Sequence, residues 1–248
     1  MSAIPSGGYE YILFDLDGTI SESGPGITRC AQYALRAFGI DEPDLKKLEV
    51  FVGPPLNVTF QQYYGFNEEE SAEAVRIFQE RYDREGVFEN ALYPGIEAML
   101  RELRAAGKHL AIASSKPRHL IPMILDRFGI TEYFEVISAP GFEQELTGKM
   151  ESDNKSHMVR QALEELGLVP PGSTESGGSG AAESPVPDLR ERAAMVGDRF
   201  YDIRGALANQ VTAVGVTYGY GSRGELLQAG ADLIADSPQE LCRLLLGR

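Results

Sequence analysis

The stretch ILFDLDGTI, residues 12–20, determines how the rest of the chain is interpreted. Its apolar beginning is typical of a strand buried on both faces, and the strand runs directly into Asp15 and Asp17. One residue separates the two acids, so their side chains point the same way while the chain stays extended. Two neighbouring like charges are costly without a counter-cation, and hard oxygen ligands favour Mg²⁺. We therefore expect a magnesium site here, with a solvated strand end as the alternative.

Apolar strand-like runs alternate with amphipathic helix-like runs along most of the sequence. Strands separated by helices indicate parallel pairing with crossover connections, so we predict an α/β fold with a doubly wound, mostly parallel, Rossmann-like sheet. The predicted strands are residues 9–14, 109–115, 134–138, 193–197, 211–219 and 232–236. The predicted helices are residues 27–39, 67–86, 94–107, 120–129, 152–167, 201–209, 223–230 and 237–248.

Two segments interrupt this alternation. Residues 21–90 show helical patterns only, which predicts a helical cap domain inserted into an α/β core made of residues 1–20 and 91–248. Residues 170–188 are rich in Pro, Gly, Ser and Ala and hold few large apolar side chains. Such a composition buries too little surface to order itself, so we expect a flexible surface loop there.

A second pair of acids follows the predicted strand 193–197, where Asp198 comes directly after the strand and Asp202 four residues later. In a parallel sheet, ligands gather beyond the carboxyl ends of the strands. Asp198 can therefore donate a carboxylate to the same metal as Asp15 and Asp17. Asp202 can contact a metal ligand without binding the metal itself, or it can orient a nearby cation.

Small polar residues at two strand ends are candidates for substrate binding. Gly18 allows a sharp turn after the first acids, and Thr19 can brace that turn. Ser114 and Ser115 offer hydroxyl and backbone N–H groups ahead of a helix, which suits an oxyanion. A serine-rich turn without a ligand is the alternative.

A site that binds an oxyanion also needs a cationic side chain, and Lys149 and Lys155 are the candidates. Lys155 lies in the first turn of the predicted helix 152–167, where a lysine opposes the helix dipole. A residue placed against that local preference is more readily explained by function. We therefore favour Lys155 over Lys149, which lies in an irregular loop.

Composition narrows the class of protein. The chain has 248 residues, 43% hydrophobic, and a formal net charge of −14. Such an acidic surface repels phosphate backbones, so a nucleic-acid polymer is an unfavourable partner. Cys30 and Cys242 fall in apolar helical patterns and are expected to be buried thiols. We find no membrane-spanning or secretory pattern and expect a cytoplasmic protein that acts without a membrane.

Four motifs in this order resemble the haloacid dehalogenase superfamily of phosphohydrolases: DLDGT (15–19), SSK (114–116), Lys155 and GDRFYD (197–202). Finer motifs are similar to its phosphoglycolate-phosphatase-like branch, and within it to bacterial 5′-nucleotidases, which carry a helical cap after the first motif. These finer motifs are FVGPPL (51–56), YYGF (63–66), VFEN (87–90), YPGI (93–96) and VTYGYGSRGEL (216–226).

The resemblance implies Mg²⁺-dependent hydrolysis of a small phosphate monoester, either phosphoglycolate or a nucleoside 5′-monophosphate. Asp15 would become phosphorylated and Asp17 would move protons, while Asp15, the Asp17 carbonyl and Asp198 would hold the metal. Ser114 and Lys155 would bind the phosphoryl oxygens. A sugar-phosphate mutase of the same fold and a non-catalytic phospho-ligand module are the alternatives. A monomer and a homodimer are both compatible with the sequence.

Overall fold

The computed structural model describes residues 4–141, 154–171 and 189–248. Its main sheet has the strand order β5-β4-β1-β6-β7-β8, and every neighbouring pair is parallel. This confirms the predicted α/β fold with a parallel sheet. The strands are β1 (Tyr11–Phe14), β4 (His109–Ala113), β5 (Val136–Ser138), β6 (Ala193–Gly197), β7 (Thr212–Val216) and β8 (Leu233–Ala235).

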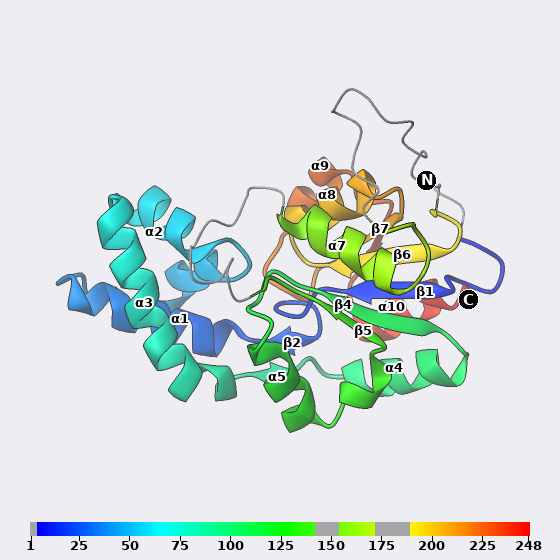
Figure 1. Ribbon diagram of the computed structural model, residues 1–248, viewed down its shortest axis with the longest axis horizontal. Helices are drawn as coiled ribbons and strands as arrows, with labels where there is room; N and C mark the ends of the chain where they lie inside the picture. Colours follow the sequence, from blue (N-terminus) through cyan, green and yellow to red (C-terminus); the bar gives the residue numbers. More distant parts are fainter. Residues whose placement is uncertain (1–3, 142–153, 172–188) are drawn as a thin grey trace.

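Helices cover both faces of this sheet (Figure 1). The helices α4 (Ile96–Ala105), α5 (Leu120–Phe128) and α10 (Pro238–Leu245) pack on one face, and α7 (Asn154–Glu165), α8 (Phe200–Ala208) and α9 (Arg223–Ala229) pack on the other. Alternate residues of β1 enter the two cores, with Ile12 and Phe14 on one side and Leu13 on the other. A strand buried on both faces needs apolar residues at every position, which explains the unbroken apolar run before Asp15.

The cap lies to one side of the sheet, at the left of Figure 1. Its helices are α1 (Gly24–Ala37), α2 (Leu56–Tyr64) and α3 (Glu68–Arg84), with short 3₁₀ helices η1 (Leu45–Phe51) and η2 (Gly86–Phe88). A capping box begins α3: Asn67 Oδ1 accepts from the Glu70 N–H at 2.9 Å, and the Glu70 carboxylate accepts from the Asn67 N–H at 3.0 Å.

The expectation that residues 21–90 are helical throughout is wrong at its start. Strand β2 (Ser21–Glu22) pairs antiparallel with β3 (Ala91–Leu92), so a short ribbon joins the core to the cap. Two-residue strands are too short to produce a hydrophobic period, which is why the sequence did not indicate them. We propose this ribbon as the boundary between the core, residues 1–20 and 91–248, and the cap, residues 21–90.

Further expectations concern the cysteines, two loop segments and membrane-spanning helices. Cys30 and Cys242 are buried free thiols, as predicted. Lys149 and most of the low-complexity stretch 170–188 lie outside the described residues. Within the described residues, no helix is both long enough and apolar enough to cross a bilayer.

Candidate active site

Three adjacent strands bring the predicted residues to one edge of the sheet. β1 lies between β4 and β6, and these strands end immediately before Asp15, Ser114 and Asp198 respectively. The Asp15 N–H donates to the Val196 carbonyl at 2.9 Å, which continues the pairing of β1 with β6 up to the acids. Parallel pairing therefore places side chains about 100 and 180 residues apart in sequence side by side.

Asp15, Asp198 and Asp202 form a buried acidic cluster. Each offers a carboxylate oxygen, and these oxygens all lie within 4.8 Å of one another. Asp198 is fully buried; its Oδ2 accepts from the Tyr220 N–H at 2.8 Å, and its Oδ1 has no hydrogen-bond partner in the described part of the chain. A buried carboxylate oxygen without a donor is expensive, so the cluster fits a metal ion with hard oxygen ligands.

The pKa values of Asp15 and Asp198 also favour a bound cation. The pKa of Asp15 is raised to about 6, mainly by burial; Lys155 opposes this rise, and the charges of Asp202 and Asp17 add to it. Burial, and then the charges of Asp202 and Asp15, also raise the pKa of Asp198 well above its usual range. Asp15 and Asp198 therefore hold protons more tightly than free aspartates, and a bound divalent cation would favour their ionised forms.

Glycines let the backbone approach this cluster. Gly18 has a φ of +87°, and a Cβ there would lie 2.4 Å from Asp198 Oδ2. A Cβ at Gly219 would lie 2.5 Å from the Asp198 Cβ and 2.3 Å from the Gly18 carbonyl oxygen. Only glycine fits both the left-handed backbone and the space at position 18, so the structure explains the glycine after Asp17.

Lys155, predicted as the active-site cation, reaches the cluster from the first turn of α7. Its ammonium donates to Asp15 Oδ1 at 2.7 Å and to the Ala113 carbonyl at 3.1 Å, and it lies 2.9 Å from Asp202 Oδ1. Burial alone would lower the pKa of Lys155, but the charges of Asp15 and Asp202 raise it above its ordinary value. The Asp202 carboxylate thus lies beside the ammonium group of Lys155.

Asp202 is itself held in place at the start of α8. Its Oδ2 accepts from the Arg199 N–H at 3.0 Å, which satisfies a free donor at the helix N-terminus. This local contact fixes the carboxylate that faces Lys155. Asp202 therefore links the end of β6 to the lysine on α7.

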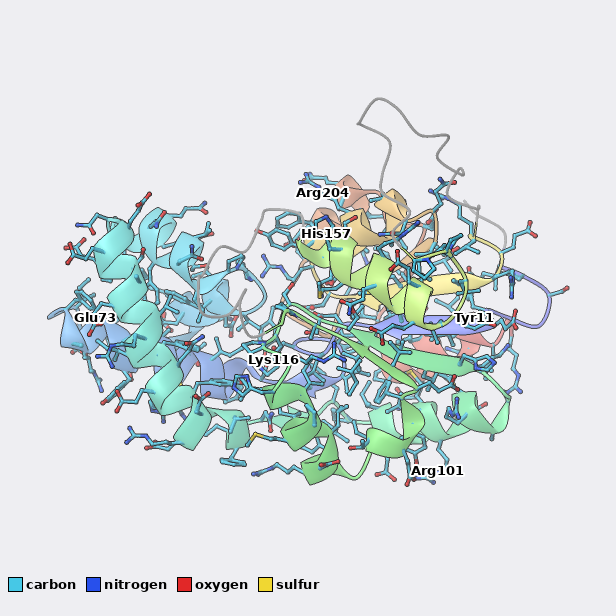
Figure 2. The ribbon with its side chains drawn as sticks, in the orientation of Figure 1. Tyr11, Glu73, Arg101, Lys116, His157 and Arg204 are labelled. Atoms are coloured by element: carbon cyan, nitrogen blue, oxygen red, sulfur yellow. The ribbon has the colours of Figure 1, made fainter. Side chains whose placement is uncertain are left out.

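Asp17 is close in sequence to Asp15 but its carboxylate has a different partner. Both of its oxygens accept from Lys116 Nζ, at 3.2 and 2.9 Å, and Lys116 also lies 2.6 Å from the Tyr82 hydroxyl of the cap. Figure 2 shows Lys116 at the junction of the cap and the sheet. Neither Lys116 nor Tyr82 is among the candidate site residues that the sequence indicates. The position of Lys116 in SSK, just past a strand end, was the available signal, whereas nothing marked Tyr82.

The small polar candidates are all close to the strand ends. The Ser114 N–H donates to the Ser138 carbonyl and is therefore not available to an oxyanion, while the Ser114 hydroxyl accepts from the Lys116 N–H at 3.3 Å. Ser115 is partly exposed. Thr19 is fully buried, and its Oγ1 lacks a hydrogen-bond partner among the described residues.

The cap touches the core beside the acidic cluster. Arg199, which follows Asp198, donates to the Val52 carbonyl of the cap at 3.0 Å and pairs with Glu225 of the core at 2.9 Å. The Tyr220 hydroxyl accepts from the Gly24 N–H at 2.7 Å at the start of α1. Residues adjacent to the cluster thus hold the cap against the core.

Comparison with protein families gives matches over most of the chain. A model described as haloacid dehalogenase-like hydrolase matches residues 12–169, and a second, described as HAD-hydrolase-like, matches residues 153–241. These matches agree with the resemblance drawn from DLDGT, SSK and GDRFYD. They include the three strand ends that form the site.

Individual proteins show the same relationship. A 5′-nucleotidase from Pseudomonas aeruginosa is 38% identical over 88% of this chain and 87% of its own length. A tyrosine-protein kinase, PtkA, from Mycobacterium tuberculosis is 32% identical over 86% of this chain and 63% of its own length. A phosphoglycolate phosphatase from Colwellia psychrerythraea is 27% identical over 94% of this chain and 95% of its own length.

The fold also has a solved counterpart. The crystal structure of a predicted phosphatase from Clostridium acetobutylicum superposes with a TM-score of 0.82 at 39% identity, and the match covers 97% of this chain and 99% of that one. The shared region includes the sheet and the inserted helices. The arrangement of strand ends described above is therefore that of a known architecture.

Proposed function

Because the chain belongs to the haloacid dehalogenase-like hydrolases and is a phosphatase of that family, we propose that it hydrolyses a nucleoside 5′-monophosphate through an aspartyl-phosphate on Asp15. The observation that carries this proposal is the Asp15 carboxylate, buried at a strand end with Lys155 at 2.7 Å and Asp198 beside it. The similarity to a 5′-nucleotidase over nearly the whole chain favours a nucleotide over phosphoglycolate.

In the first step, a carboxylate oxygen of Asp15 attacks phosphorus. The new bond from that oxygen to phosphorus forms as the ester P–O bond breaks, and Asp17 gives a proton to the departing alcohol oxygen. In the second step, water attacks the aspartyl-phosphate, Asp17 takes a proton from that water, and the bond from Asp15 to phosphorus breaks. The products are the alcohol and inorganic phosphate, and Asp15 is regenerated.

Charge balance explains the remaining residues. Lys155 and the Ser114 hydroxyl hold phosphoryl oxygens. Gly18, Thr19 and Ser115 are the further candidates for contact with the substrate. Asp15, the Asp17 carbonyl and Asp198 would hold Mg²⁺, whose charge offsets the repulsion between the Asp15 carboxylate and the phosphoryl group. Asp202 keeps Lys155 directed at Asp15, since the Lys155 ammonium lies 2.9 Å from its carboxylate.

A phosphate-release screen tests this function. The chain would be assayed with Mg²⁺ against nucleoside 5′-monophosphates, phosphoglycolate and sugar phosphates, with Asp15→Asn as the control. We expect release from a nucleotide that disappears in Asp15→Asn and after chelation of the metal. Isomerisation of a sugar phosphate without release, or ATP-dependent labelling of a tyrosine peptide as the name of the mycobacterial relative would suggest, would contradict it.

A further inference from the structure

A cap tyrosine contacts the lysine that pairs with Asp17. Tyr82 lies near the end of α3 and is only 3% exposed, although α3 belongs to the cap. Its hydroxyl oxygen is 2.6 Å from Lys116 Nζ, and that ammonium also lies 4.7 Å from the centre of the Tyr82 ring. Tyr82 therefore contacts the lysine through both its hydroxyl and its aromatic face.

Lys116 connects this tyrosine to Asp17. An ammonium group has three donors and no acceptor, so the Tyr82 oxygen and the Asp17 oxygens must all accept from it. The bonds to Asp17 are 3.2 and 2.9 Å long, and Lys116 is 7% exposed. Little solvent is available to replace a lost acceptor, so the position of the Lys116 ammonium depends on Tyr82. The position of the Asp17 carboxylate depends on Tyr82 in turn, because it is bonded to that ammonium.

We propose that Tyr82 is a positioning residue that makes proton transfer by Asp17 depend on the closed cap. This inference rests on the proposed function, in which Asp17 protonates the departing oxygen while the ester P–O bond breaks. When α3 is docked, Tyr82 holds Lys116 where it aligns the Asp17 carboxyl with that oxygen. When α3 moves away, Lys116 loses its hydroxyl acceptor and the alignment is lost, so an open site does not protonate a leaving group.

The proposal predicts a dependence on the leaving group. An alkyl ester, such as a nucleoside 5′-monophosphate, needs a proton on its departing oxygen, whereas p-nitrophenolate departs readily without one. We expect Tyr82→Phe to lower kcat/KM for the nucleotide by on the order of tenfold or more, because general acid catalysis is typically worth at least that much. The same variant should leave kcat/KM for p-nitrophenyl phosphate within about twofold of wild type.

Tyr33→Phe is the matched control, since Tyr33 lies on cap helix α1 with 45% of its surface exposed. Tyr33→Phe should leave kcat/KM unchanged for both substrates. Equal losses on both substrates in Tyr82→Phe would indicate a structural role and overturn the proposal, as would no loss on either.

A double-variant comparison tests the proposal on the nucleotide alone, independently of the leaving group. If Tyr82 acts through Lys116, then Tyr82→Phe added to Lys116→Met should lower the nucleotide rate no further than Lys116→Met alone. Fully additive losses would overturn the proposal. Wild type that releases phosphate from none of the esters would contradict the proposed function itself, whereas an active wild type with an unaltered leaving-group dependence in Tyr82→Phe would contradict only the role of Tyr82.

Discussion

Lys155 donates a 2.7 Å hydrogen bond to Asp15 across 140 residues of sequence, and both groups are buried. This pair joins the first strand of the sheet to helix α7 and neutralises part of the acidic cluster. Burial of an unpaired charge is far more costly than burial of a pair. The pair is therefore a structural element of the core as well as a part of the proposed catalytic site.

Lys155→Met should destabilise the metal-free protein strongly. Removal of one partner of a buried pair typically lowers the free energy of unfolding by about 3–5 kcal/mol, because the buried carboxylates of Asp15 and Asp202 lose their counter-charge. Urea unfolding without metal measures this change. Added Mg²⁺ should recover part of the loss. Lys46→Met, at an exposed cap position, is the control, and an equal effect of the two substitutions would contradict the account.

Gly18→Ala should abolish metal binding. Gly18 and Gly39 both have positive φ, +87° and +75°, so alanine at either position costs about 1–2 kcal/mol of backbone strain. Only at Gly18 would the new Cβ collide with Asp198, whereas nothing lies within 4 Å of it at Gly39. Calorimetric titration with Mg²⁺ should show binding in Gly39→Ala and none in Gly18→Ala. Normal binding in Gly18→Ala would show that the ion does not use Asp198.

The stabilisation by Mg²⁺ should increase with pH. Burial raises the pKa of Asp15 from 3.8 to about 6, so the folded protein holds more protons than the unfolded chain between these values. The metal-free protein therefore loses stability as the pH rises through this window. Mg²⁺ needs the ionised carboxylates, so it binds better as the proton leaves. The rise in Tm on addition of Mg²⁺ should be larger at pH 7 than at pH 5, and a rise independent of pH would contradict this assignment.

The parts of the site that lie at strand ends could be predicted from the sequence. An unbroken apolar run followed by an acid is a local pattern, and parallel pairing then brings such ends together whatever the connecting segments contain. Asp15 and Asp198 meet for this reason. Lys155 could be predicted because its place in a helix first turn opposes the local preference.

Contacts between the cap and the core could not be predicted in the same way. Tyr82 has the spacing of an ordinary buried residue on an amphipathic helix, and its contact with Lys116 exists only because α3 docks against the core. Similarly, no local pattern shows that the Ser114 N–H is used by β5. Contacts that form only when the cap docks or when strands pair do not alter the hydrophobic periodicity of either segment.

A crystal structure with Mg²⁺ and beryllium fluoride, a mimic of the phosphoryl group, tests the central claim most directly. The account predicts one metal ion between the carboxylates of Asp15 and Asp198, with the mimic bonded to an Asp15 oxygen and Lys155 in contact with it. A structure in which Asp15 and Asp198 have no ion between them, or in which the mimic is attached elsewhere, would contradict it.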